Sequence, residues 1–197
     1  MLVSVRPRPP LERPSPLSRR QIVLRREALI EPVSGGPALA EAEALLTEFH
    51  RRLADLFQDV PALAQTFPAQ PGWSLEPGLL APEYQPPAGS LLLARVDARP
   101  VGLVAVRPLP EASGCAELRR LYVRDGHRGR GIARELLERA IGEARRLGYR
   151  ELRLETSPRM PDAEHLYRQA GFQPIPAYRA RAAELDRHYR SLSLPLP

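Results

Sequence analysis

Residues 117–148 read ELRRLYVRDGHRGRGIARELLERAIGEARRLG, and this stretch decides the fold. Its beginning, residues 115–123, has the pattern of a buried strand and runs directly into arginines and glycines. From residue 131 to about residue 147, apolar residues recur at helical spacing. Gly148 then stands where helices commonly end. The sequence therefore predicts a strand, a glycine-rich turn and an amphipathic helix in direct succession.

The turn in this unit suits a diphosphate. Its residues are Arg128-Gly129-Arg130-Gly131-Ile132-Ala133, and they point main-chain N–H groups and the positive end of a helix at one place. Glycine allows the backbone to approach an anion closely. The P-loop sequence Gly-Lys-Ser/Thr is absent, and Arg134 stands where the dinucleotide pattern G-x-G-x-x-G requires its last glycine. A diphosphate ligand of another kind is indicated.

The spacing Arg128-x-x-Gly131-x-Ala133 resembles the acyl-CoA motif R/Q-x-x-G-x-G/A of the GNAT superfamily of N-acetyltransferases. Three further stretches resemble the same family in the same order. ELRRLYV is similar to its fourth core strand, GYRELRLET (148–156) to its fifth strand, and AEHLYRQAGF (163–172) to its A-x-x-L-Y-x-x-x-G-F segment. The resemblance covers residues 21–194 and is densest over residues 90–172.

The remaining patterns agree with that resemblance. Together they predict an α/β (mixed α+β) fold, with a central mixed, mostly antiparallel, twisted sheet of about six or seven strands flanked by about four helices. The other predicted elements are strands at 21–29, 148–157 and 188–194, a hairpin over 90–109, and helices at 38–57, near 61–67 and at 161–171.

The length of 197 residues suits one domain better than two. Five of the 23 prolines fall within residues 1–18, where few apolar residues are available for a core. We therefore expect a Pro/Arg-rich, disordered tail over residues 1–19 and a GNAT-like domain over residues 20–197. A ligand for a proline-recognising module is the alternative interpretation of the tail.

Composition excludes several classes. The net charge is +6, but every basic residue is arginine, which looks like codon bias, so nucleic acid is not the expected partner. A single cysteine excludes an internal disulfide, and the four histidines lack metal-ligand spacing, so we expect no metal. No apolar run could span a bilayer and no secretory signal is evident, so the sequence predicts a cytoplasmic protein without membrane contact.

The resemblance assigns the cofactor-binding residues. It implies that the backbone of Arg128, Gly129, Arg130, Gly131, Ile132 and Ala133 cradles the pyrophosphate of acetyl-CoA. It also implies that the strand end Leu121, Tyr122 and Val123 pairs with the pantetheine arm through main-chain groups, where the fourth and fifth strands part. The amide of Val123 would then hold the oxyanion. For the side chains of Arg128 and Arg130, contact with phosphate and simple solvent exposure remain alternatives.

Two residues are the catalytic candidates. Tyr167 matches the family's general acid, and its hydroxyl, with an ordinary pKa near ~10, can protonate the departing thiolate; a packing aromatic is the alternative. An alkyl ammonium must lose a proton before it attacks, and Glu117 is the first candidate to accept it. Its alternative is an ion pair with Arg119 or Arg153, and Glu155 is the second choice as base.

Two positions depart from the pattern. Met160 stands where many family members have asparagine, so any contact of that side chain with the cofactor is lost or replaced. Cys115 could be mistaken for a nucleophile, but transfer in this family is direct, and we interpret it as a small strand residue.

The acceptor is the part of the reaction that the sequence determines least. The resemblance places its site near residues 53–84 and 174–181, where scattered aromatic residues could line a pocket or form small separate cores; they are Phe57, Phe67, Trp73, Tyr84 and Tyr178. The sequence thus predicts direct acetyl transfer from acetyl-CoA to a primary amine of a small molecule or peptide. The alternative is a non-catalytic acyl-CoA-binding or regulatory module of the same fold, and a homodimer is possible.

Overall fold

The computed structural model describes residues 28–67, 74–76 and 79–197. Within these residues a central seven-stranded sheet has the order β1-β4-β5-β6-β7-β9-β8, and every neighbouring pair is antiparallel except β6 and β7. This confirms the predicted mixed, mostly antiparallel sheet. The strands of this sheet are β1 (Leu29–Pro32), β4 (Ser90–Val96), β5 (Arg99–Pro108), β6 (Cys115–Val123), β7 (Glu151–Thr156), β8 (Gln173–Ile175) and β9 (Arg190–Pro195).

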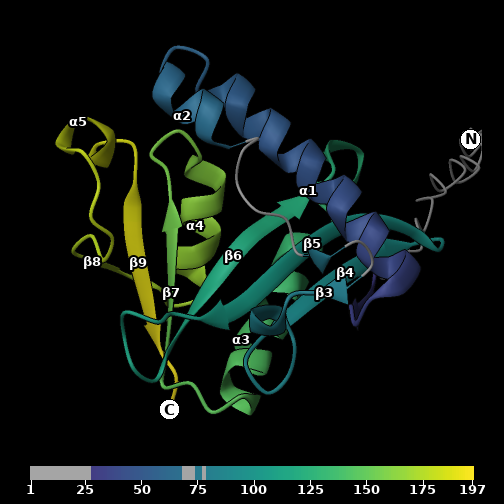
Figure 1. Cartoon of the computed structure of the whole chain (residues 1–197). Coiled ribbons are helices and arrows are strands. Elements are labelled where there is room, and N and C mark those ends of the chain that lie inside the picture. Colours follow the sequence, from purple (N-terminus) through teal and green to yellow (C-terminus); the bar gives the residue numbers. More distant parts are fainter. Residues whose placement is uncertain (1–27, 68–73, 77–78) are drawn as a thin grey trace, which may run out of the picture.

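Helices cover both faces of the sheet. In Figure 1, α1 lies across one face, and α3 and α4 lie on the other. The helices are α1 (Gly36–Leu56), α2 (Pro61–Thr66), α3 (Ile132–Arg146), α4 (Pro161–Gln169) and α5 (Ala183–Asp186), with two 3-10 turns, η1 (Pro82–Tyr84) and η2 (Asp125–His127). The four predicted helices are confirmed within two residues at each end. Helix α5 was not predicted, because four residues show no periodicity.

Alternation along the strands builds the two layers of core. Leu91 and Leu93 of β4 face α1, whereas Leu92 and Ala94, their neighbours in sequence, face α3. All four side chains are at most 2% exposed. Strands this apolar on both faces are typical of a sheet covered on both sides.

The hairpin of β4 and β5 was predicted from its turn. Asp97 and Ala98 connect the strands and both have positive φ, 50° and 62°. Two consecutive left-handed residues define the tight turn whose twist matches that of antiparallel strands. The hairpin thereby fixes β5, which in turn pairs with β6.

Two irregularities of β6 shape the middle of the sheet. First, β6 pairs with β7 over Cys115, Ala116 and Glu117, and no pairing follows beyond Glu117 among the described residues. Second, the register against β5 shifts near Arg120, whose φ is +60°. Such a shift marks a bulge that bends a strand. The strands therefore part where the resemblance implied, as Figure 1 shows for β6 and β7.

Some predictions fall outside the described residues. These are the tail at 1–19, most of the strand expected at 21–29, and Trp73. The first described strand is β1, which ends at Pro32, beyond the end of the strand expected at 21–29. The connection at 58–90 contains α2, η1 and a small second sheet of β2 (Ser74–Glu76) and β3 (Leu79–Leu80). Within the described ranges, no helix has the length and hydropathy needed to cross a bilayer.

Candidate active site

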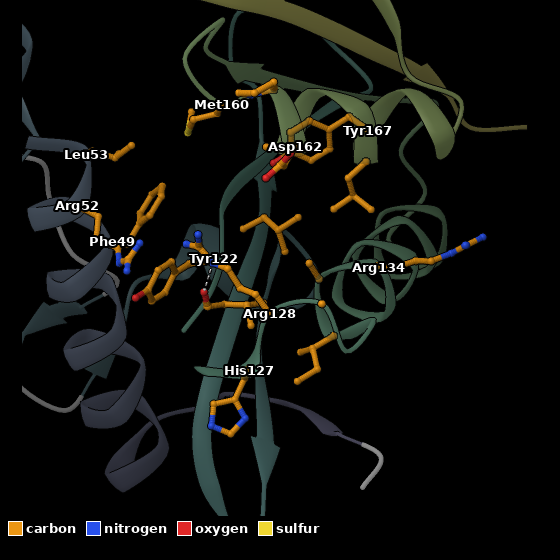
Figure 2. Close-up of a pocket in the computed structure, with 18 of the residues that line it drawn as sticks. Phe49, Arg52, Leu53, Tyr122, His127, Arg128, Arg134, Met160, Asp162 and Tyr167 are labelled. Carbon is orange, nitrogen blue, oxygen red and sulfur yellow. Dashed lines mark hydrogen bonds between the residues drawn. The ribbon is translucent and has the colours of Figure 1, made fainter. Parts of the chain in front are cut away.

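A groove of about 570 Å³ opens where β6 and β7 part. It lies between the second half of α1, the end of β6, the turn before α3 and the start of α4. Eight of the nine predicted cofactor-binding residues line it, namely Leu121, Tyr122, Val123, Arg128, Gly129, Gly131, Ile132 and Ala133. The ninth, Arg130, is exposed and does not belong to the lining. Figure 2 shows the groove between α1 and α4.

Glycines are required in the turn by backbone conformation. Gly129 has a φ of +71°, and Gly131, the residue that caps α3, has a φ of +90°. A Cβ at Gly129 would meet nothing within 4 Å, and one at Gly131 would meet only Glu135 at 3.8 Å. The left-handed φ, rather than lack of space, therefore selects glycine at both positions. The result is an open helix end facing the groove, which suits an anion.

The side chain of Arg128 turns back toward the sheet. Its Nε donates to the carbonyl oxygen of Val123 at 3.0 Å, and its Nη1 lies 3.2 Å from a carboxylate oxygen of Asp125. Arg52 of α1 also pairs with Asp125. Figure 2 shows the bond between Arg128 and Val123 as a dashed line. The arginine thus braces the turn against the end of β6.

Tyr167 reaches the groove from α4. The side chain is 7% exposed, and its ring packs edge-on against Phe172 with centroids 5.9 Å apart. Burial raises the pKa of the Tyr167 hydroxyl, which therefore keeps its proton at neutral pH. Figure 2 shows the ring pointing from α4 toward the groove. The ring packs in the core, as the packing alternative expects, and it also lines the groove, so the role of Tyr167 as general acid stays a prediction.

A second cavity, of about 320 Å³, adjoins the groove on the side of β7 and α5. We call it the arginine cavity. Its charged lining residues are Arg119, Arg120, Arg179, Arg181, Glu117 and Glu155, and its apolar and polar ones include Phe49, Leu53, Phe57, Phe67, Thr156, Met160 and Tyr189. Three side chains, Phe49, Leu53 and Met160, line both the groove and the arginine cavity. The two spaces therefore adjoin at these three side chains, which we call the partition.

Glu117, the first candidate base, lies on the wall of the arginine cavity rather than in the groove. Its Oε2 accepts from Arg107 at 3.0 Å, Arg119 at 3.2 Å and Arg179 at 2.7 Å. Its Oε1 accepts from the hydroxyl of Tyr178 at 3.2 Å. Burial raises the pKa of Glu117, but the three guanidinium groups outweigh burial and hold it below its usual value. The ion pair with Arg119 that the sequence allowed is thus present.

Glu155, the second candidate, lies on the same wall of the arginine cavity. It pairs with Arg181, whose Nε also lies 3.6 Å from Asp186. The guanidinium of Arg181 stacks over the ring of Tyr189, 3.8 Å from its centroid. This arginine is therefore held from three sides and has little freedom to move.

The β6 bulge brings two consecutive arginines to one cavity. In a regular strand Arg119 and Arg120 would point to opposite faces of the sheet. Here both line the arginine cavity, because the bulge inserts an extra residue at Arg120. Burial and then the Arg119 cation lower the pKa of Arg120 to about 10. Burial and then Arg120 and Arg119 lower the pKa of His50, on the neighbouring α1, to about 4.

Several other candidates lie away from both spaces or are occupied. Cys115 is buried at the start of β6, and its thiol donates to Glu151 at 3.1 Å. Tyr84 is buried in the core under α1, whereas Phe57 and Phe67 line the arginine cavity and also form a small separate core. Among the described residues, no group of three acidic, histidine or cysteine side chains could hold a metal ion.

The arginine cavity was missed as a charged site. Two of the segments that contribute to it, residues 53–67 and 179–181, fall in the regions expected near the acceptor, but Arg120, Arg179 and Arg181 were not singled out. One signal was available, because two consecutive arginines inside a strand that otherwise reads as buried are unusual. The positions of Arg179 and Arg181, in contrast, depend on the tertiary fold.

Comparison with known proteins finds relatives among N-acetyltransferases. Among curated relatives, the chain is 36% identical over 97 residues to an uncharacterized N-acetyltransferase of Schizosaccharomyces pombe, covering 49% of this chain and 59% of that protein. It is 30% identical over 138 residues to the uncharacterized N-acetyltransferase YjgM of Escherichia coli, covering 64% of this chain and 81% of that protein.

Among solved structures, a candidate acyl-CoA N-acyltransferase of Klebsiella pneumoniae superposes with a TM-score of 0.61 at 25% identity, covering 86% of this chain and 97% of the other. The family model of the acetyltransferase (GNAT) family matches residues 51–172, which include the last six residues of α1, the turn and α4. The chain belongs to the GNAT family of acetyltransferases.

Proposed function

We propose that the protein transfers an acetyl group from acetyl-CoA directly to a primary amine. The observation that carries the proposal is the groove itself, in which the parted strands β6 and β7 lie beside a helix end capped by a left-handed glycine. One part of the groove offers main-chain groups along an unpaired strand edge, and the other offers main-chain donors for an anion. An elongated molecule with a diphosphate at one end matches both.

The residues divide into binding and chemical roles. We assign the main chain of residues 128–133 to the pyrophosphate and the main chain of Leu121 and Val123 to the pantetheine amides. The Val123 amide would donate to the thioester oxygen as negative charge develops there. Acetyl-CoA supplies the activated acyl group. The C–S bond breaks as the new N–C bond forms, and the hydroxyl of Tyr167 gives its proton to the departing sulfur.

For the proton that the amine loses, Glu117 is the first acceptor in this proposal and Glu155 the second. Both carboxylates line the arginine cavity and not the groove. The lowered pKa of Glu117 makes it a weak base, so transfer through water and on to solvent fits its surroundings best.

The paired state of Glu117 also favours a second candidate function, a non-catalytic acyl-CoA-binding module of the same fold. A carboxylate already bound by three guanidinium groups is a structural element in its own right. One assay separates the two. Release of CoA thiol, followed with DTNB over a panel of amines, is expected for the enzyme.

Calorimetry with acetyl-CoA at low ionic strength supplies the second readout. Heat of binding without thiol release from any amine would support the binding module. If acetyl-CoA gives no heat of binding, both candidate functions are wrong. If the protein is an enzyme, the Tyr167→Phe variant should bind acetyl-CoA as the wild type does and release thiol more slowly.

A further inference from the structure

The arginine cavity holds more positive charge than its own carboxylates neutralise. Four arginines line it against two glutamates; outside the lining, Asp186 lies 3.6 Å from Arg181, and Arg107 also pairs with Glu117. Each of these glutamates accepts from at least one arginine already. Buried cations are rarely left unbalanced, because their desolvation is costly. An excess of guanidinium groups in a cavity therefore points to an anionic ligand.

Backbone strain at the cavity supports this interpretation. Arg120 has a left-handed φ of +60°, a conformation that costs a non-glycine residue roughly 1–2 kcal/mol. The strained residue is a half-buried arginine whose pKa is already lowered by burial and by other arginines. Strain of this kind is concentrated at functional sites. The bulge thus places the Arg120 cation in the arginine cavity, where a regular strand would not place it.

Unsatisfied polar atoms mark the same wall. The Oγ1 of Thr156, the Nε of Arg179 and the Nη1 of Arg181 are buried, and none has a hydrogen-bond partner among the described residues. Thr156 is 3% exposed. A buried donor without a partner is destabilising, and a missing ligand or water is a common reason for finding one. Two planar guanidinium groups and a hydroxyl can together bind a carboxylate through several hydrogen bonds.

We propose that the arginine cavity binds the acceptor as a free α-amino acid with an apolar side chain, and that its arginines hold the carboxylate. This inference rests on the acetyl transfer proposed above and names the class of its acceptor. The carboxylate is the charged group to be recognised, and the α-amine is the nucleophile.

The position of Arg120 argues for an amine next to the carboxylate. Val123, whose amide the proposed function assigns to the thioester oxygen, follows Arg120 by three residues, about 10 Å along the strand. Arg119 and Arg120 line the arginine cavity, which shares Phe49, Leu53 and Met160 with the groove. An anion bound there therefore lies in the space next to the reacting carbonyl. In an α-amino acid the amine and the carboxylate are attached to the same carbon, which fits two adjoining spaces.

The apolar lining argues for an apolar side chain. Phe57 and Phe67 form one side of the arginine cavity, with ring centroids 5.5 Å apart, and Met160 belongs to the partition. A volume of about 320 Å³ lies at the small end of ligand sites. It suits a single amino acid better than a long peptide.

The same cations also favour the reactive form of the amine. A nearby positive charge disfavours a second one, so an ammonium group beside Arg119 and Arg120 loses its proton more readily than in water. Burial is the main cause of the lowered pKa of His50 on α1, and Arg120 and Arg119 lower it further, which agrees with a field that extends to α1. The arginines thus lower the basicity that the proton acceptor needs, which agrees with the weak basicity of Glu117.

Matched ligands test the proposal. We would compare L-leucine with L-leucinamide, which keeps the shape but lacks the negative charge, and with 3-methylbutylamine, which lacks the carboxyl group altogether. The ratio of kcat/KM for L-leucine to that for L-leucinamide should be at least about tenfold, because hydrogen bonds to a charged group are lost in the amide. L-Phenylalanine and 2-phenylethylamine form a second pair.

Matched variants test the residues. Arg120→Gln and Arg179→Gln should reduce the ratio for L-leucine over L-leucinamide toward one. Arg146→Gln, on the exposed end of α3 where it pairs with Glu143, should leave the ratio unchanged. Because the ratio compares two ligands on the same variant, partial loss of folded protein does not affect it.

The failures of the two proposals are distinguishable. If acetyl-CoA binds and amines are acetylated, but the amide or the simple amine is used as well as the amino acid, the acceptor class is wrong and the acetyltransferase stands. If no amine is acetylated, the acceptor class is tested by comparing the binding of L-leucine and L-leucinamide to the CoA complex by calorimetry. Equal binding, or no binding of the amino acid, overturns the inference.

Discussion

The groove and the arginine cavity lie on two sides of the same three side chains, Phe49, Leu53 and Met160. The end of β6 and the turn before α3 form one part of the groove. They are close in sequence and offer mainly main-chain groups to a ligand. The arginine cavity is formed by side chains from α1, β6, β7 and residues 179–189. A motif in the sequence therefore reveals the groove, whereas the cavity becomes visible only after folding.

The largest expected effect lies in the groove. Tyr167→Phe removes the proton donor and keeps the ring, so kcat should fall by about 10²-fold or more, whereas the affinity for acetyl-CoA should not change. DTNB-monitored turnover and calorimetry measure the two quantities. Tyr149→Phe is the matched control, since that hydroxyl bonds to the carbonyl of Ala88 outside the groove. Equal turnover in the two variants would assign Tyr167 a packing role.

The next effect lies in the arginine cavity and concerns stability. Glu117, with a side chain 3% exposed, compensates three guanidinium groups. Removing one partner of a buried ion pair typically costs about 3–5 kcal/mol, so Glu117→Gln should lower the free energy of unfolding by an amount of this order. Urea unfolding measures it.

Glu155→Gln serves as the comparison for Glu117→Gln, because Arg181 is the one ion-pair partner of Glu155 among the described residues. Its loss of stability should be smaller. If Glu117→Gln keeps the wild-type stability and abolishes turnover at saturating substrate, the carboxylate acts as a base and the structural interpretation of its ion pairs is wrong.

A smaller effect tests the backbone of the groove. Gly131→Ala places a Cβ on a residue with a φ of +90°, which should weaken acetyl-CoA binding by roughly tenfold, equivalent to about 1.4 kcal/mol of strain. Gly142→Ala changes the same residue type inside α3, where a Cβ meets nothing within 4 Å. That variant should bind normally and gain slight stability. Similar affinities in both would show that the turn does not hold the diphosphate.

A further effect tests the electrostatic difference between the two regions. The pKa of His50 is lowered from about 6.5 to about 4, so between these pH values the unfolded chain binds a proton that the folded chain does not. Stability should therefore fall as the pH drops from 6.5 to 4, by at most about 1.4 kcal/mol per pH unit from this residue. Urea unfolding at pH 7 and pH 4.5 measures the loss. The loss should be smaller in His50→Gln, and an equal loss in both proteins would contradict the assigned shift.

The same comparison explains which parts of the fold could be predicted from the sequence. Helices α1 and α3 and strand β6 were predicted closely, because each has a clear period and a glycine or proline at its boundary. The short elements β8 and α5 were not predicted, since three or four residues carry no periodic signal. They depend on contacts with neighbouring strands, which no local pattern encodes.

The site shows the same division. The groove-lining residues near Gly131 were predicted, because a main-chain site leaves glycines at fixed spacing. The convergence of Arg120, Arg179 and Arg181 was not, because it depends on a bulge and on a distant segment. Local sequence reports backbone requirements well and long-range side-chain neighbourhoods poorly.

The partition of Phe49, Leu53 and Met160 has a consequence for how this protein diverges. In the proposed reaction the donor and the acceptor both contact these three side chains. A smaller residue at Met160 would admit a longer acyl chain, and it would also enlarge the space for the incoming nucleophile. Chain-length preference and acceptor preference are therefore not independent traits here, and natural variation at these three positions should alter both together.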